Sequence, residues 1–181
     1  MLLQITVQDL IARLRQLQIV RHGEVQLSHG GTSDTYFDFK EKAYGDAEAF
    51  YLINKYLGQQ IPNRVNCIAG EGDGGKPLAT GLSLMYWRRQ TLVRSQLKDH
   101  GIKRRFEGYT PQEGDRVVIV DDVFTTGRSM QKVVDLIVPT GVEILGCYVL
   151  LKRGEGEVSI SRGEEKIPVP IESLLRVEDL L

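Results

Sequence analysis

Residues 117–130 read VVIVDDVFTTGRSM: four aliphatic residues, two adjacent aspartates, and a loop of small and polar residues. An uninterrupted aliphatic run is typical of a strand that is buried on both faces, as the strands of a parallel sheet are. The strand predicted over 116–122 therefore ends on Asp121 and Asp122, where two like charges stand side by side. Because ligands of open parallel sheets bind beyond the carboxyl ends of the strands, this placement predicts a ligand site.

The rest of the chain alternates between the two kinds of pattern. Helical spacing or a helix-start signal recurs at 7–18, 45–60, 77–90 and 128–138, and short apolar runs fall at 65–70, 91–94, 116–122 and 143–151. Such alternation predicts βαβ crossovers and hence an α/β fold, a Rossmann-like open parallel sheet flanked by helices. We expect a single domain over 1–181, with a core at about 45–152 and a small hood formed by about 1–44 and 153–181.

Composition excludes several classes of protein. The formal net charge of −1 gives no global attraction to nucleic acid or to an anionic membrane. No apolar run approaches the ~20 residues of a membrane span, so we expect a cytoplasmic protein that binds neither nucleic acid nor membrane. Cys67 and Cys147 each lie in an apolar run, where a buried thiol is expected, and no cluster of Cys and His suggests a metal centre.

The loop after the aspartates has the composition of an anion site. Thr125, Thr126, Gly127, Arg128 and Ser129 place hydroxyls and approachable backbone N–H groups at the start of a predicted helix, where a phosphate is favoured. Carboxylates beside a phosphate suit a ligand that also carries hydroxyls or Mg²⁺. A ribose phosphate has hydroxyls and can carry Mg²⁺. The plainer alternative is a strand followed by a capped helix.

A second phosphate motif competes with this interpretation. Residues 70–77, GEGDGGKP, fit the G-x-x-x-x-G-K part of a Walker A loop, and VVIVDD could then be a Walker B strand. However, the next position of a P-loop needs a hydroxyl for Mg²⁺, and Pro77 has neither a hydroxyl nor an N–H. The sequence therefore disfavours a nucleotide hydrolase.

The segment 94–108, RSQLKDHGIKRRFEG, is locally basic. It has two acidic residues and five cationic ones, and the cationic residues are Arg94, Lys98, Lys103, Arg104 and Arg105. A bare run of charge is most simply a solvated loop. A connection of this length between two buried strands is, however, commonly a lid or a binding loop.

These motifs together resemble a known family. The stretch 117–130 matches the phosphoribosyl-pyrophosphate (PRPP) motif of type I phosphoribosyltransferases, and KDHG at 98–101 resembles orotate phosphoribosyltransferases in particular. Three further segments are similar to that family's substrate segment, pyrophosphate loop and base-binding strand end: LSHGGTSDTYFDF (27–39), GDGGKP (72–77) and LLKRGEG (150–156). The resemblance covers most of the chain and implies the type I phosphoribosyltransferase fold.

The resemblance implies an activity: transfer of the phosphoribosyl group of PRPP to orotate, giving orotidine 5′-monophosphate and pyrophosphate. Mg²⁺ would enter with PRPP, with no direct protein ligand assigned, and a homodimer would share its active sites through the KDHG loop. The implied catalytic residues are Lys98, Asp121, Asp122 and His100. The implied PRPP-binding residues are Arg94, Lys98, His100, Asp121, Asp122, Thr125, Thr126, Gly127, Arg128, Ser129, Gly74 and Gly75, and the implied orotate-binding residues are Arg153, Thr125, Tyr36 and Phe37.

The chain departs from the family where several cations are usual. Ser95, Gly74 and Ser28 stand at positions that in many members are basic. Two alternatives therefore stay open beside orotate transfer: a phosphoribosyltransferase that acts on another base, and a non-catalytic regulator that binds PRPP or a nucleotide on the same fold.

Overall fold

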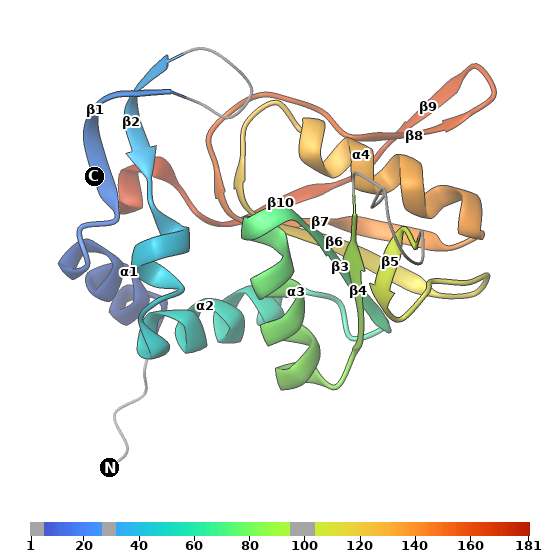
Figure 1. Ribbon diagram of the computed structural model, residues 1–181, viewed down its shortest axis with the longest axis horizontal. Coiled ribbons are helices and arrows are strands. Elements are labelled where there is room, and N and C mark those ends of the chain that lie inside the picture. The colour runs from blue at the N-terminus through green and yellow to red at the C-terminus, as the bar shows by residue number, and fades with distance from the viewer. Residues whose placement is uncertain (1–5, 27–31, 95–103) are drawn as a thin grey trace.

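The computed structural model describes residues 6–26, 32–94 and 104–181. Its elements follow one another along the chain as Figure 1 shows. They are α1 (Val7–Gln16), β1 (Val20–Gln26), β2 (Thr32–Phe37), η1 (Phe39–Ala43), α2 (Ala47–Gln60), β3 (Cys67–Glu71), α3 (Gly72–Tyr86), β4 (Arg89–Val93), β5 (Phe106–Gly108), β6 (Arg116–Phe124), α4 (Arg128–Ile137), η2 (Val138–Thr140), β7 (Glu143–Lys152), β8 (Ser159–Arg162), β9 (Glu165–Pro168), β10 (Ile171–Leu175) and η3 (Val177–Asp179).

A six-stranded sheet forms the centre of the molecule, in the order β10-β7-β6-β3-β4-β5. Its neighbouring strands are parallel, except that the edge strand β5 pairs antiparallel with β4. The helices α2 and α3 lie on one face and α4 lies on the other, as Figure 1 shows. The predicted α/β fold with a parallel sheet flanked by helices is confirmed.

Alternate residues of the central strands enter two different cores. On β6, Val118 and Val120 join the core beneath α2 and α3, whereas Val117 and Ile119 join the core beneath α4. Both faces of the strand are therefore buried, which explains why its sequence is continuously apolar instead of alternating.

The strand β6 is longer than expected. It was predicted to end at Asp122 but runs to Phe124. Its pairing with β3 reaches Val120, whereas its pairing with β7 continues to Phe124 opposite Lys152. The two aspartates therefore lie on a stretch of strand that β7 supports and β3 leaves open on the other side.

The helix α3 begins earlier than the sequence indicated. A helix was predicted over 77–90, but the helix begins at Gly72 and Pro77 lies inside it. The glycines are the first turn of this helix. Gly72 has a φ of +64°, which glycine adopts without strain, and this allows the chain to pass directly from β3 into the helix.

The C-terminal segment contributes to the sheet as well as to the hood. The predicted boundary placed 153–181 outside the core, but β10 pairs in parallel with β7 at the sheet edge. The hairpin of β8 and β9 pairs separately. Its strand β8 packs beside α4, where the side chain of Gln131 bonds both the N–H and the carbonyl of Ser159.

The hood consists of α1, the β1–β2 hairpin and η1, together with the end of the chain. The helix α1 begins at Val7, after the N-cap Thr6. Its buried residues Leu10 and Leu14 share one core with Leu180, and Arg15 Nε donates to the carbonyl of Asp179 at 3.0 Å. The two ends of the chain are thus joined beside β2, which forms one wall of the pocket described below.

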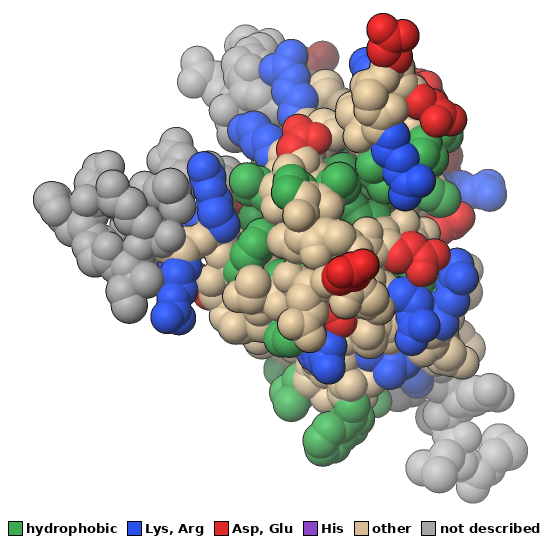
Figure 2. Space-filling view, turned by 90° about the vertical axis from the view of Figure 1, so that its right-hand side faces the viewer, with side chains coloured by type: hydrophobic (Ala, Val, Ile, Leu, Met, Phe, Trp, Pro, Cys, Tyr) green, Lys and Arg blue, Asp and Glu red, His purple; other side chains and the backbone are tan. Residues whose placement is uncertain are grey.

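The burial of the two cysteines and the mixture of charges on the surface agree with what the composition indicates. Cys67 and Cys147 are free and buried, as predicted. Acidic and basic side chains are mixed over the face shown in Figure 2. Among the described residues, no helix is long and apolar enough to cross a membrane.

Candidate active site

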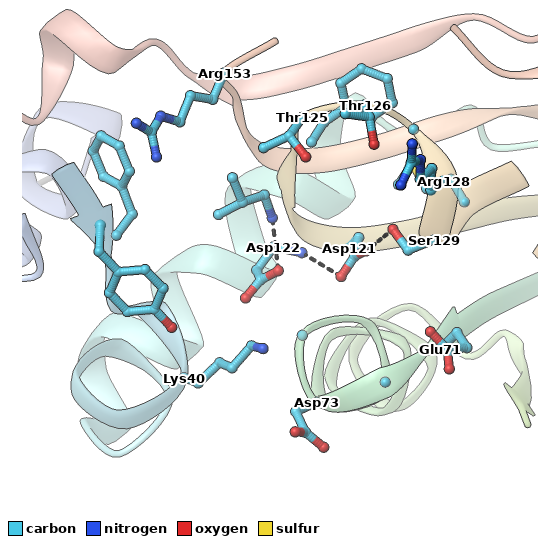
Figure 3. A pocket seen from close by; sticks show the side chains of 18 residues that line it. Lys40, Glu71, Asp73, Asp121, Asp122, Thr125, Thr126, Arg128, Ser129 and Arg153 are labelled. Carbon is cyan, nitrogen blue, oxygen red and sulfur yellow. Dashed lines mark hydrogen bonds between the residues drawn. The ribbon is translucent and has the colours of Figure 1, made fainter. Parts of the chain in front are cut away.

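A pocket of about 510 Å³ lies at the carboxyl ends of β3 and β6. It is built from four segments: β2 with η1, the start of α3, the end of β6 with the following loop, and Arg153 after β7. Figure 3 shows Arg153 at one end and Arg128 with Ser129 at the other, with the two aspartates between them. The lining residues are Tyr36, Phe37, Lys40, Glu71, Gly72, Asp73, Gly74, Asp121, Asp122, Val123, Phe124, Thr125, Thr126, Gly127, Arg128, Ser129, Met130 and Arg153.

The carboxylate pair is held by short local hydrogen bonds. Ser129 donates its hydroxyl to Asp121 Oδ2 at 3.0 Å, and the N–H of Asp122 donates to Asp121 Oδ1 at 3.0 Å. The N–H of Val123 donates to Asp122 Oδ1 at 2.8 Å. Burial, followed by the neighbouring charge of Asp122, raises the pKa of Asp121 from its ordinary 3.8 to about 7. The pair is thus fixed in place and costly to ionise fully.

Gly74 brings the backbone of α3 against both aspartates. A Cβ at this position would collide with Asp122 Oδ1 and would lie 2.7 Å from Asp121 Oδ1. No side chain fits here while the carboxylates keep their positions. Gly75 was expected to approach the ligand but does not line the pocket; a Cβ there would lie 2.6 Å from the carbonyl oxygen of Val120, so it serves the contact between α3 and β6.

Tyr44 is a residue of this region that the sequence did not indicate. Its hydroxyl donates to the carbonyl oxygen of Gly74 at 3.1 Å, and its ring contacts Phe50 edge to face. Burial, with the charges of Asp122 and Asp121, raises the pKa of Tyr44 well above its ordinary value. The hydroxyl therefore stays protonated and keeps donating to the first turn of α3. A tyrosine after a charged segment gives no sequence signal for such a role.

The predicted phosphate loop, Thr125 to Ser129, lines the pocket at its Arg128 end. Gly127 is the N-cap of α4 with a φ of +77°, a conformation that favours glycine. The segment after Arg153 supports this loop backbone against backbone. A Cβ on Gly154 would lie 2.9 Å from the carbonyl carbon of Thr125, and a Cβ on Gly156 would lie 2.7 Å from Thr126 Cα. These two glycines are positioning residues that the sequence reasoning missed.

The three residues predicted to bind the base, Arg153, Tyr36 and Phe37, lie together at one end of the pocket. Arg153 Nη1 donates to the carbonyl oxygen of Thr35 at 2.7 Å, and its guanidinium lies 5.6 Å from the centre of the Phe37 ring. The backbone N–H of Arg153 donates to the carbonyl of Phe124 at 2.8 Å. A guanidinium stacked on an aromatic ring is well placed to receive a flat anion.

Similarity to known proteins agrees with this geometry. The family described as phosphoribosyl transferase domain matches residues 94–171. An orotate phosphoribosyltransferase of Methanocaldococcus jannaschii is 37% identical over 147 residues, which is 81% of this chain and 82% of the relative. One from Halobacterium salinarum is 33% identical over 175 residues, covering 96% and 95%.

The chain belongs to the orotate phosphoribosyltransferase family. The crystal structure of orotate phosphoribosyltransferase from Aeropyrum pernix superimposes with a TM-score of 0.72 at 27% identity, over 95% of this chain and 96% of that one. The family predicted from residues 117–130 and 98–101 is thus confirmed, and the Walker A alternative is wrong. The residue roles stay predictions.

The basic segment of this family member is described only in part. Lys98 and His100, the other two predicted catalytic residues, lie outside the described residues, as do Ser95, Lys103 and Ser28. Arg94 is described and pairs with Glu107. Its N–H donates to the carbonyl of Arg105 at 2.9 Å, and Arg94 itself is not among the described residues that line the pocket.

The family's use of Mg²⁺ fits the oxygen donors of the pocket. Asp121 and Asp122 present adjacent carboxylates, and among the described residues neither has an ion-pair partner. No group of three or more metal-ligating side chains occurs in the described part of the chain. A Mg²⁺ ion would therefore take most of its oxygens from a ligand and from water, which is the usual arrangement for this ion.

Proposed function

We propose that the protein transfers the phosphoribosyl group of PRPP to orotate, giving orotidine 5′-monophosphate and pyrophosphate, a step of pyrimidine biosynthesis. The observation that carries the proposal is the order of groups along one pocket: an anion loop at one end, a carboxylate pair in the middle and a stacked guanidinium at the other. That order matches a 5′-phosphate, a ribose and an anionic base. The family membership of the chain supports the same assignment.

In this proposal each part of the pocket acts on one part of the substrates. The loop Thr125–Ser129 holds the 5′-phosphate, and Asp121 and Asp122 accept the ribose hydroxyls. The same carboxylates face the anomeric carbon, where positive charge develops as the bond to pyrophosphate breaks. Preplaced negative charge in a partly buried site stabilises such a transition state more than the ground state.

The base is held from two sides. Tyr36 and Phe37 on β2 supply apolar contact for the ring, while Arg153 supplies positive charge for the orotate carboxylate. Thr125, between Arg153 and the carboxylates in Figure 3, can reach both ligands. Mg²⁺, when bound with PRPP, would neutralise the pyrophosphate and so make it a better leaving group.

The proposal includes a homodimer that shares its active sites. In the family resemblance, Lys98 and His100 act in the partner subunit's site, where they would neutralise the leaving group. A cytoplasmic location is also proposed, since both substrates are anions that do not cross a bilayer unaided.

The decisive experiment measures orotate consumption with PRPP and Mg²⁺, together with the appearance of orotidine 5′-monophosphate. We expect turnover that depends on both substrates, and its loss in a double variant Asp121→Asn, Asp122→Asn that still binds PRPP. Turnover with another base but not orotate would favour the related transferase. Binding of PRPP by the parent without turnover of any base would favour the regulator.

The shared site has its own test. Lys98→Ala and Asp122→Asn should each lower kcat by on the order of 10²-fold or more, as expected when one transition-state contact is lost. Mixed dimers of the two variants should regain part of the activity, because one of the two sites is then intact. No rescue after verified subunit exchange would contradict the shared site.

A further inference from the structure

The charges that line the pocket are unevenly distributed. Four described lining residues are acidic and three are basic; they are Glu71, Asp73, Asp121 and Asp122, and Lys40, Arg128 and Arg153. The proposed substrate PRPP carries two separate anionic groups, a 5′-phosphate and a pyrophosphate, and orotate adds a carboxylate. Each anion needs positive charge near it, because the acidic wall repels it.

Two of the three cations are already placed at the ends of the pocket. Arg153 is held on Phe37 and on the carbonyl of Thr35, at the base end. Arg128 is the first residue of α4 and lies beside Ser129 at the phosphate loop, as Figure 3 shows. Neither guanidinium therefore serves the wall formed by the start of α3.

Lys40 is the described cation on that side. Figure 3 shows its amino group extending into the pocket between Asp122 and Asp73. Among the described residues, Lys40 forms no ion pair, and its side chain is exposed to solvent in the open pocket. Its charge is thus available to a ligand.

The start of α3 cannot supply this positive charge from position 74. Position 74 faces the same space, but a Cβ there would collide with Asp122 Oδ1 and would lie 2.5 Å from Asp122 Cγ. A lysine at position 74 is therefore incompatible with this placement of the carboxylates. Lys76, the cation of the same helix, does not line the pocket, whereas Lys40 of η1 does.

The backbone of Lys40 is held firmly although its amino group is not. Its neighbours Asp38 and Phe39 are 5% and 0% exposed, so they anchor the π-helical turn in the core. The same turn ends at Tyr44, which donates to the carbonyl of Gly74. This bond ties the end of η1 to the first turn of α3, the wall that Lys40 faces. A π-helical turn at a functional site is a recurrent arrangement.

We infer that Lys40 binds the pyrophosphate group of PRPP and of the released product, and so supplies the positive charge that position 74 cannot carry. This inference rests on the proposed function. An ammonium on a flexible stem donates three hydrogen bonds without a fixed orientation, which suits an anion whose charge moves as the bond to ribose breaks. Lys40 is then a binding residue for the leaving group, separate from the base and from the 5′-phosphate.

The test compares ligands that differ only in the pyrophosphate. Calorimetric titrations of PRPP, ribose 5-phosphate, inorganic pyrophosphate and orotate, with Mg²⁺ present throughout, are made on the parent and on Lys40→Met, which keeps the stem and removes the charge. We expect PRPP and pyrophosphate to bind about 10- to 100-fold more weakly to the variant, as for a lost charged hydrogen bond. The affinities for ribose 5-phosphate and for orotate should change by less than about twofold, which is within the range of effects of surface substitutions. Lys40→Arg should restore most of the affinity.

Lys42 gives a matched control. It lies in the same turn but lines a different cavity with Arg15 and Arg21, so Lys42→Met should bind all four ligands as the parent does. Equal losses for PRPP and ribose 5-phosphate, or a loss for orotate alone, would overturn the inference. If the parent turns over orotate while Lys40→Met binds pyrophosphate at parental affinity, the inference fails alone. If the parent binds neither PRPP nor pyrophosphate, the proposed function fails with it.

Discussion

Replacing Asp121 by Asn should stabilise the free protein in a pH-dependent way. Burial and the charge of Asp122 raise the pKa of Asp121 from 3.8 to about 7. Between these two values the folded protein keeps a proton that the unfolded chain has lost. The free energy of unfolding therefore falls as pH rises through this window, and above it the whole cost of the buried charge is present. Each pKa unit is about 1.4 kcal/mol, so the rise corresponds to about 4 kcal/mol.

The assay is urea-induced unfolding of the parent and Asp121→Asn at intervals from about pH 4 to about pH 8. Asparagine resembles the protonated carboxyl, so the difference between the two free energies of unfolding should be near zero at the acid end. It should grow to about 4 kcal/mol in favour of the variant at the alkaline end. Asp135→Asn, an exposed position on α4, is the control and should show no such growth. A difference that is constant over the whole range would refute the reasoning.

Three other expectations follow from the pocket and the core. Arg153→Ala should weaken orotate binding by roughly 2–4 kcal/mol and leave PRPP almost unchanged in calorimetry, because a partly buried charged contact is lost at the base end alone; equal losses for both ligands would contradict this. Gly156→Ala should weaken PRPP binding measured in the same way by about 1–3 kcal/mol, since the new methyl group displaces Thr126, and unchanged affinity would show that the loop adapts freely. Burial raises the pKa of Cys67 to about 11 and of Cys147 to about 12, so neither thiol should react with Ellman's reagent until the protein unfolds; fast reaction of either would be contrary to the described core.

Much of the sheet could be predicted because its strands are buried on both faces. The runs at 117–120 and 147–151 are apolar without interruption, and this composition has few structural alternatives. The strand β10 was missed for the opposite reason. It lies at an edge, where Glu172 and Ser173 interrupt the apolar pattern, and only its pairing with β7 makes it a strand.

The site could be predicted where one local segment carries all its parts. Residues 121–129 form such a segment, and the structure places them together in one pocket. Lys40, Tyr44 and Gly74 could not be assembled in this way, because they meet through the packing of η1 against α3. Nor does a helical period identify a π-turn, since its five residues are fewer than two turns of any helix.

The support of the phosphate loop by Gly154 and Gly156 has a consequence for protein engineering. Arg153 is joined to Phe124 by a backbone hydrogen bond. At Gly154 and Gly156 the backbone lies so close to Thr125 and Thr126 that neither position has room for a side chain. Residues inserted or enlarged between 153 and 156 to accept a new base would therefore displace the loop Thr125–Ser129. That loop is proposed to hold the 5′-phosphate, which the reaction needs whichever base is used. Tyr36 and Phe37 lie on β2, a separate element that meets this segment through the side chain of Arg153, so libraries that vary these two aromatic residues should yield altered base preference with less loss of PRPP affinity.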